Sequence, residues 1–211
     1  MKNIRQKVSE LFIAFTITLF SISFWSVCVI YFRPLYTWSI DLFHIEETSG
    51  FTKTQILENY NALMNYNLPW VTGKLSLPSL PQSPEAIQHF AEVKDIFNLL
   101  LALIPITGIL LIIYVRCIWK RKDLHYLKTA SITLILTPFI LGLGFLIDFN
   151  RTFTLFHKLF FDNDYWLFDP LSDPIISMLP KEFFMLCGIV IIVFQFLTSL
   201  GCYLAYRKTS R

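Results

Sequence analysis

Four long stretches of the chain contain no Asp, Glu, Lys or Arg: residues 11–32, 96–115, 129–147 and 183–206. A helix needs about 20 apolar residues to cross the hydrocarbon core of a bilayer, and each stretch has about that length. Because lipid offers no partners to backbone N–H and C=O groups, a spanning segment must close its hydrogen bonds internally. Charged residues make up only 16% of the chain, against roughly 25% in soluble domains. The sequence predicts an all-α membrane protein with four transmembrane helices, forming a single membrane domain over residues 1–211.

The distribution of charge predicts the orientation of these helices. Eleven of the 18 basic residues lie before the first stretch, in the loop 116–128 or in the C-terminal tail, whereas 13 of the 15 acidic residues lie elsewhere. Cytoplasmic loops carry the excess of Lys and Arg. We therefore expect both termini to be cytoplasmic, with residues 33–95 and 148–182 outside the cell. The first stretch is too long for the apolar region of a cleaved signal peptide, so we expect it to remain in the mature protein.

The first exterior segment, residues 33–95, is too apolar and too rich in Tyr, Trp and Leu for a disordered tether. We interpret it as a cap that rests on the membrane surface. Within it, residues 52–65 place four apolar side chains on one helical face: Ile56, Tyr60, Leu63 and Met64. This pattern is typical of an amphipathic helix at a membrane interface.

A further helix start is indicated by Ser83, Pro84 and Glu85, which have the residue types of an N-cap, a first helical position and a first turn. Four prolines within residues 69–84 exclude a regular helix before this point and predict an extended connector. No helix breaker follows before Pro105. The helix should therefore begin outside the membrane and continue into the second span.

One aromatic-rich stretch, residues 148–170, contains a single histidine. On a helix this histidine lies within an apolar stripe at i, i+3, i+4, i+7 and i+8, made of Phe153, Phe156, His157, Phe160 and Phe161. A candidate partner lies in the first exterior segment, where His89 shares a helical stripe with Val93, Ile96 and Leu100, next to Glu92. Both histidines belong to exterior segments that must cover the same bundle. From the residues alone, packing and chemistry explain them equally well.

The sequence lacks the motifs that are typical of several other functional classes. The sequence has no G-x-S-x-G elbow, no H-E-x-x-H, no phosphate-binding glycine loop and no basic and aromatic strip for nucleic acid. Two histidines with Glu92 or an aspartate fit no strong metal template, so we expect no metal. Arg33 directly follows the first span and Asp148 directly follows the third, both on the predicted outer side of the membrane, so their side chains could form an ion pair.

A non-enzymatic carrier or assembly factor remains an alternative, although carriers usually place charged groups inside their spans.

Two motifs carry a family resemblance. The sequence FHKLFFDNDYWLFDP followed by DPIISMLP, and SPEAIQHFAEVKDIF before the second span, resemble the lipoprotein intramolecular transacylases of Gram-positive bacteria over the whole length of the chain. The resemblance implies a multi-pass enzyme of the bacterial cell membrane, with its active site on the extracellular side. Its substrate would be a diacylated lipoprotein, whose sn-2 acyl chain moves to the α-amino group of the N-terminal cysteine. The product is a lyso-form lipoprotein, and neither a cofactor nor an acyl-enzyme is implied.

The two functional histidines of that family correspond by motif to His89 and His157, and Glu92 stands where an acid, commonly Asp, is expected. An amine with a pKa of about 8 must lose a proton before it attacks an ester, and the leaving oxygen must gain one, which suits groups that titrate near neutrality. We assign the base to His157 and the second role to His89.

The surroundings of these histidines complete the prediction. Candidate pocket walls are Phe160, Phe161, Tyr165 and Trp166, and candidate oxyanion donors are Arg33, Asn150 and Arg151. We expect a monomer in contact with membrane lipid and not with nucleic acid. A second enzymatic alternative is an intermolecular acyltransferase that uses phospholipid as the acyl donor.

Overall fold

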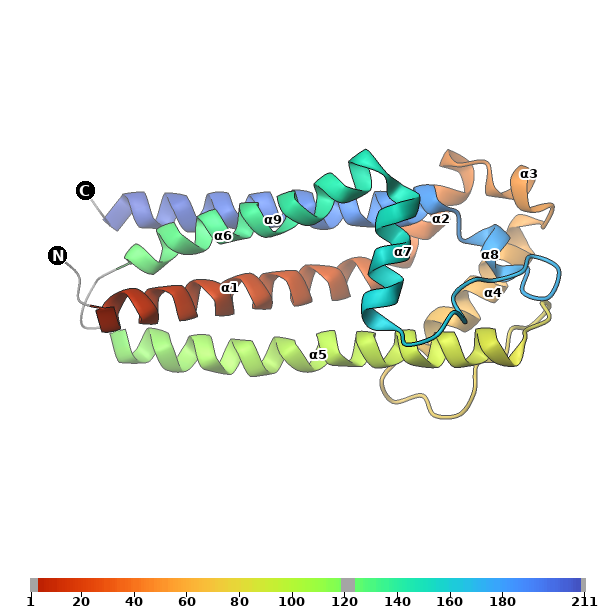
Figure 1. Ribbon diagram of the computed structural model, residues 1–211, viewed down its shortest axis with the longest axis horizontal. Coiled ribbons are helices and arrows are strands. Elements are labelled where there is room, and N and C mark those ends of the chain that lie inside the picture. The colour runs from red at the N-terminus through yellow and green to blue at the C-terminus, as the bar shows by residue number, and fades with distance from the viewer. Residues whose placement is uncertain (1–3, 119–123, 210–211) are drawn as a thin grey trace. The chain divides into compact units, whose positions relative to one another are not determined.

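The computed structural model describes residues 4–118 and 124–209, and every regular element within these ranges is a helix. The elements are α1 (Ile4–Tyr31), α2 (Arg33–Leu42), α3 (Ile45–Ser49), α4 (Lys53–Tyr66), α5 (Pro84–Ile118), α6 (His125–Ile147), α7 (Phe149–Phe160), α8 (Ile175–Met178) and α9 (Lys181–Thr209) (Figure 1). Lys120, Arg121 and Lys122 of the predicted basic loop lie outside the described residues.

Four of these helices, α1, α5, α6 and α9, are long and apolar enough to cross a membrane. Each coincides with one of the predicted charge-free stretches and extends it by several residues. The prediction of an all-α protein with four long apolar helices is confirmed. The side of the membrane on which the termini lie stays a prediction.

The chain divides into two compact units. The bundle unit comprises Met1–Cys28, Leu100–Phe149 and Ile189–Arg211, and the histidine unit comprises Val29–Leu99 and Asn150–Gly188. The division falls inside α1, α5 and α9.

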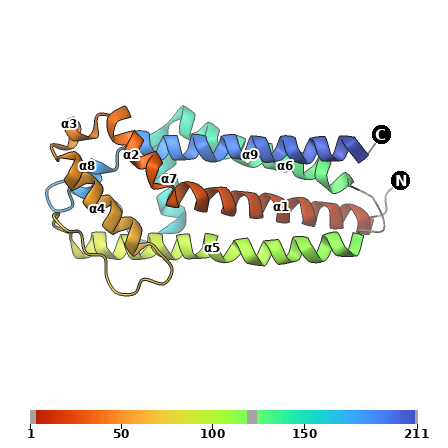
Figure 2. The same ribbon diagram turned by 180° about the vertical axis from the view of Figure 1, so that it is seen from behind.

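The helices of the bundle unit run side by side (Figures 1 and 2). The start of α1, the end of α5, the start of α6 and the end of α9 lie at the same end of this unit (Figure 2). This arrangement agrees with the predicted topology, in which the loop between α5 and α6 shares one side of the membrane with both termini.

Hydrogen bonds between helices hold the bundle unit together. Ser21 Oγ of α1 donates to Gln195 Oε1 of α9 at 2.8 Å, and Gln195 is 1% exposed. Trp25 of α1 donates its indole N–H to Thr198 Oγ1 at 3.0 Å. Its ring also stacks on Phe194 with centroids 4.2 Å apart. Since lipid tails are as apolar as Leu, such polar contacts supply much of the specificity of helix association in membranes.

The histidine unit has a core of its own, built around Tyr36 of α2. Tyr36 is fully buried, its ring stacks on Tyr60 of α4 with centroids 3.6 Å apart, and its hydroxyl donates to the Met178 carbonyl at 2.7 Å. The short helices α2, α3 and α8 were not predicted from the sequence, because each is too short to show a hydrophobic period.

The predicted amphipathic helix exists as α4, with Thr52 as its N-cap in a capping box with Gln55. The expectation that its apolar face lies on the membrane surface is wrong. Ile56 is 0% exposed and Leu63 is 5% exposed, because this face packs inside the histidine unit. The period of a helix identifies an apolar face but not whether protein or lipid covers it.

The predicted start of α5 is confirmed in detail. The helix begins at Pro84, Ser83 Oγ accepts a hydrogen bond from Ala86 N at 3.0 Å, and no helix precedes it between Asn67 and Ser83. Ser83 N also donates to Asp173 Oδ1 at 2.7 Å, and Asp173 is 3% exposed. A buried carboxylate therefore ties the segment before α8 to the N-terminus of α5.

Replacing Gln195 with Ala should lower the free energy of unfolding by about 0.5–2 kcal/mol, because hydrogen bonds between transmembrane helices contribute amounts of this order. Thermal unfolding in detergent micelles measures the change. Thr137→Ala is the matched control, because the Thr137 hydroxyl donates to Thr133 O within its own helix. An unchanged unfolding temperature in the Gln195 variant would contradict a role for this contact in joining α1 to α9.

Candidate active site

The structure brings His89 of α5 and His157 of α7 together within the histidine unit. Their ring centroids are 5.9 Å apart and their planes are inclined by 31°. His89 is 5% exposed and His157 is 9% exposed. Two histidines 68 positions apart in the chain thus form one buried pair.

Aromatic side chains enclose this pair. Phe161 contacts both rings, with centroids 4.8 Å from His89 and 5.6 Å from His157. Trp166 lies 4.7 Å from His157, and Phe168 lies 5.4 Å from His89. These three rings come from residues 161–168, the segment that follows α7. Their apolar surfaces replace water around the imidazoles.

The backbone of α7 determines the tautomer of His157. Its Nδ1 lies 2.8 Å from the carbonyl oxygen of Phe153, one helical turn earlier. Because a carbonyl oxygen only accepts hydrogen bonds, Nδ1 must carry the proton, and Nε2 of the neutral ring keeps its lone pair. His157 is therefore oriented to accept a proton or a hydrogen bond at Nε2.

The second ring differs in its hydrogen bonding. His89 Nδ1 is buried and has no hydrogen-bond partner in the part of the chain that the structure describes. A buried polar atom without a partner costs about 1–3 kcal/mol. Functional sites are among the few places where such a cost is retained, because a substrate group can supply the partner.

Burial lowers the pKa of both rings. Desolvation, and to a smaller extent the neighbouring His157, lower the pKa of His89 to about 4, although the Glu92 carboxylate opposes the shift. For His157, desolvation lowers the pKa and the hydrogen bond to the Phe153 carbonyl opposes it. Both residues lie outside the charge-free stretches, and at neutral pH both rings are uncharged.

Two of the four predicted wall residues, Phe161 and Trp166, contact the histidines. Phe160 is 49% exposed and packs on Phe156 instead, and Tyr165 is 42% exposed. A shared helical stripe with His157 at i+3 therefore does not place the Phe160 ring against the histidine pair. Phe168, which contacts His89, is a further wall residue that was not among the four predicted ones.

The predicted oxyanion donors are spread over the molecule. The Arg33 guanidinium donates to Asn61 Oδ1 at 3.0 Å and to Asn65 Oδ1 at 2.6 Å, and thereby links α2 to α4. Asn150 and Arg151 are exposed in the first turn of α7. Asp148 is exposed and belongs to the bundle unit, so its pairing with Arg33 stays a prediction.

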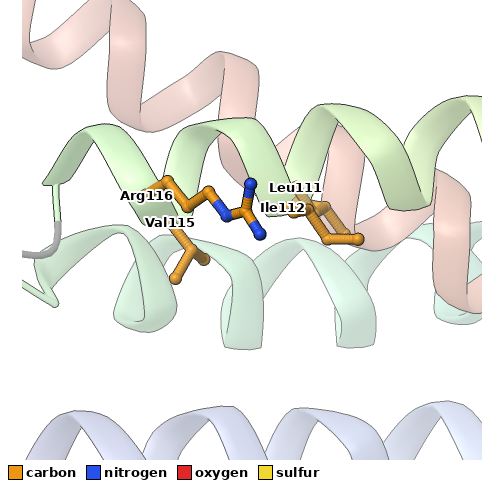
Figure 3. Close-up of a pocket in the computed structure, with 4 residues that line it drawn as sticks. All are labelled: Leu111, Ile112, Val115 and Arg116. Atoms are coloured by element: carbon orange, nitrogen blue, oxygen red, sulfur yellow. The ribbon is translucent and has the colours of Figure 1, made fainter.

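Two other kinds of site receive no support. Among residues 4–118 and 124–209, no group of three or more His, Cys, Asp or Glu side chains is placed to hold a metal ion. A shallow hollow in the bundle unit is lined by Leu111, Ile112, Val115 and Arg116, all from α5 (Figure 3). Its lining is aliphatic except for one guanidinium, which suits contact with lipid and not catalysis.

Comparison with known proteins identifies the family. The family model of lipoprotein intramolecular transacylase Lit matches residues 11–184. The chain belongs to this family. It is therefore an acyltransferase and a multi-pass membrane protein, as the sequence motifs predicted, and not a carrier or assembly factor. A comparison with curated proteins gave no match.

Solved structures of Lit from Bacillus cereus have the same fold. One is 36% identical to this chain, covers 97% of it and 95% of its own chain, and superposes with a TM-score of 0.91. Two others have a histidine replaced by arginine or by alanine; each is 35% identical, covers 97% of this chain and 91% or 93% of its own, and has a TM-score of 0.87. The fold of the Bacillus cereus protein thus survives replacement of that histidine.

We expect the His89 ring to stay neutral at pH 6, where an ordinary histidine with a pKa near 6.5 is mostly protonated. Because the pKa of His89 lies at about 4, its ring should gain a proton only as the pH falls from 6 towards 4. The unfolded chain binds this proton near pH 6.5, so the stability of the fold should decrease as the pH drops from about 6.5 to about 4. The ¹⁵N shifts of labelled histidine in micelles, assigned with a His89→Gln variant, measure the titration. A midpoint at or above 6.5 would contradict the burial of the ring.

Proposed function

We propose that this chain transfers the sn-2 acyl chain of a diacylglyceryl group to the α-amino group of the N-terminal cysteine of a bacterial lipoprotein. The product is the lyso-form lipoprotein. Membership of the transacylase family supports the reaction class. The observation that carries the proposal is the buried pair of neutral imidazoles, His89 and His157, with ring centroids 5.9 Å apart.

The reaction needs two proton movements. The amine nitrogen forms a bond to the ester carbonyl carbon, the bond from that carbon to the glyceryl oxygen breaks, and the nitrogen loses a proton while the oxygen gains one. Groups that accept and deliver protons near neutral pH perform such transfers. We assign the acceptor to His157 Nε2, because its Nδ1 proton is held by the Phe153 carbonyl.

We assign the second role to His89. Its Nδ1 is buried without a partner, so the ring is suited to hydrogen-bond the developing oxyanion or to deliver a proton to the leaving glyceryl oxygen. The proton that His157 accepts from the amine must in the end reach the leaving glyceryl oxygen, so that both rings are neutral again when the product forms. Arg33, Asn150 and Arg151 remain predicted oxyanion donors.

Confinement is the other contribution of the site. The donor ester and the acceptor amine belong to one molecule, so the barrier includes folding a flexible head group into a ring with the amine against the carbonyl. Well-oriented intramolecular reactions recover about 7–11 kcal/mol of such barriers. The rings of Phe161, Trp166 and Phe168 would restrict the head group and exclude water that competes for the ester.

The proposed reaction takes place on the extracellular side of the cell membrane. Residues 33–95 and 148–182 carry most of the acidic residues, and the basic segments lie elsewhere in the chain. His89 belongs to the predicted cap, residues 33–95, and His157 to the second exterior segment, residues 148–182. We propose a monomer that works without a cofactor or metal and takes its substrate from the surrounding lipid.

Replacing His157 with Ala should abolish formation of the lyso-form, and replacing His89 with Ala should reduce it by at least about 10²-fold, the lower range for general acid or base catalysis. Mass spectrometry of the N-terminal lipoprotein peptide measures the product, and thermal unfolding in micelles checks the fold. His44→Asn is the matched control, because His44 is exposed and has a φ of 51°, which Asn adopts readily. Wild-type turnover in the His157 variant would overturn the assignment.

The purified protein should convert a labelled diacylated lipoprotein in detergent without added phospholipid, because the acyl donor is part of the substrate. The label should appear in the same peptide with its total number of acyl carbons unchanged. An intermolecular acyltransferase would stay inactive until phospholipid is supplied, and would then transfer the phospholipid's acyl chain. That outcome would replace the intramolecular reaction with the phospholipid-dependent alternative.

A further inference from the structure

Asn163 lies in the segment that covers the histidines, and both of its polar side-chain atoms are hydrogen-bonded, Oδ1 within the segment and Nδ2 to α5. Its Oδ1 accepts from Tyr165 N at 3.0 Å, and its main-chain oxygen accepts from the Trp166 indole at 3.1 Å. Its Nδ2 donates to the Glu92 carboxylate at 3.0 Å and 3.2 Å. One residue therefore shapes the turn, fixes the Trp166 ring and connects the turn to α5.

Glu92 lies on α5 one turn after His89. Its carboxylate accepts hydrogen bonds from neutral amides at two places, Asn163 in the covering segment and Gln88 on its own helix, the latter at 3.0 Å. The contact with Asn163 joins residues 71 positions apart in the chain. A hydrogen bond to an ionised acceptor is roughly twice as strong as a neutral one, so this long-range contact is suited to hold a loop.

The chain that continues from residues 161–168 towards α8 has a second attachment to the same helix. Asp173 accepts from Ser83 N at 2.7 Å, before the first turn of α5. His89 lies between the two attachment points, Ser83 and Glu92, along α5. The segment between Asn163 and Asp173 is thus held at both ends against the helix that carries His89, and Phe168, which contacts His89, lies within it.

We infer that Glu92 and Asn163 form a clasp that holds residues 161–168 closed over the histidine pair, which makes both of them positioning residues for the proposed acyl transfer. This inference rests on the proposed function for its consequence in catalysis, but the clasp itself is a property of the loop. Its action passes through Trp166 and Phe161, the rings that contact His157. Opening the clasp would admit water to the imidazoles and release the walls that confine the substrate.

A reciprocal exchange of the two clasp residues tests the inference. Glu92→Gln keeps an acceptor for the Asn163 amide and should reduce turnover by no more than about threefold. Asn163→Asp keeps the acceptor for Tyr165 N but places two carboxylates next to each other, where they repel. It should reduce turnover at least tenfold, which is within the range of interaction free energies between residues in direct contact. In the double variant, the new amide at position 92 donates to the new carboxylate at position 163. Turnover should recover at least fivefold over the single Asn163→Asp variant.

Hydrogen exchange at residues 161–168 is the second measurement. Exchange should accelerate in Asn163→Asp and return towards the wild-type rate in the double variant, with the unfolding temperature of each variant recorded alongside. Gln88→Ala is the matched control, because Gln88 donates to the same carboxylate oxygen as Asn163 but lies on α5 and not in the loop. It should change neither the exchange rate nor turnover.

The outcomes separate the clasp from its rivals. A severe loss in Glu92→Gln with wild-type exchange at residues 161–168 would overturn the clasp and make Glu92 a direct substrate ligand. A double variant no better than Asn163→Asp would also overturn it. If the wild-type protein formed no lyso-form lipoprotein, the proposed function would fail, while the exchange rates would still test whether the clasp holds the loop.

Discussion

The removal of two imidazoles from water is the constraint on which the histidine unit depends. Phe161, Trp166 and Phe168 surround His89 and His157, and this desolvation lowers the pKa of both rings. A neutral imidazole is available as a base at physiological pH, whereas an imidazolium is not. The aromatic enclosure therefore supplies the neutral imidazoles that the proposed acyl transfer requires, and it would also exclude water that competes for the ester.

Burying two polar rings costs desolvation free energy, and hydrogen bonds with neighbouring groups offset part of this cost. The Phe153 carbonyl satisfies Nδ1 of His157 and leaves Nε2 for chemistry, whereas Nδ1 of His89 is buried without a partner in the described part of the chain. The enclosure must also stay closed. The covering segment is short and lacks a helix, so contacts to α5 at Glu92 and Ser83 determine its position. His89 and the two residues that hold the covering segment, Ser83 and Glu92, thus lie on or directly before one helix, α5.

Much of the architecture follows from local patterns. The charge-free stretches indicate α1, α5, α6 and α9, because each meets the length that a bilayer requires, and Ser83 with Pro84 indicates the start of α5. The helices α2, α3 and α8 escape prediction because they have 10, 5 and 4 residues, too few for a clear period. The apolar face of α4 was recognised, but its burial against Tyr36 depends on a partner 24 positions earlier in the chain.

The sequence by itself determined the spans, their predicted orientation, the helices that carry His89 and His157, and the motifs of the transacylase family, because these depend on composition, period and local order. Only the tertiary structure decided that the two rings lie 5.9 Å apart, that Phe161, Trp166 and Phe168 enclose them, and that Phe160 does not. These features join segments about 70 positions apart, and no local pattern encodes which side chains meet across such a distance. The hydrogen bond between Glu92 and Asn163 could not be predicted for the same reason. The two polar residues meet only after folding brings α5 against the segment that follows α7.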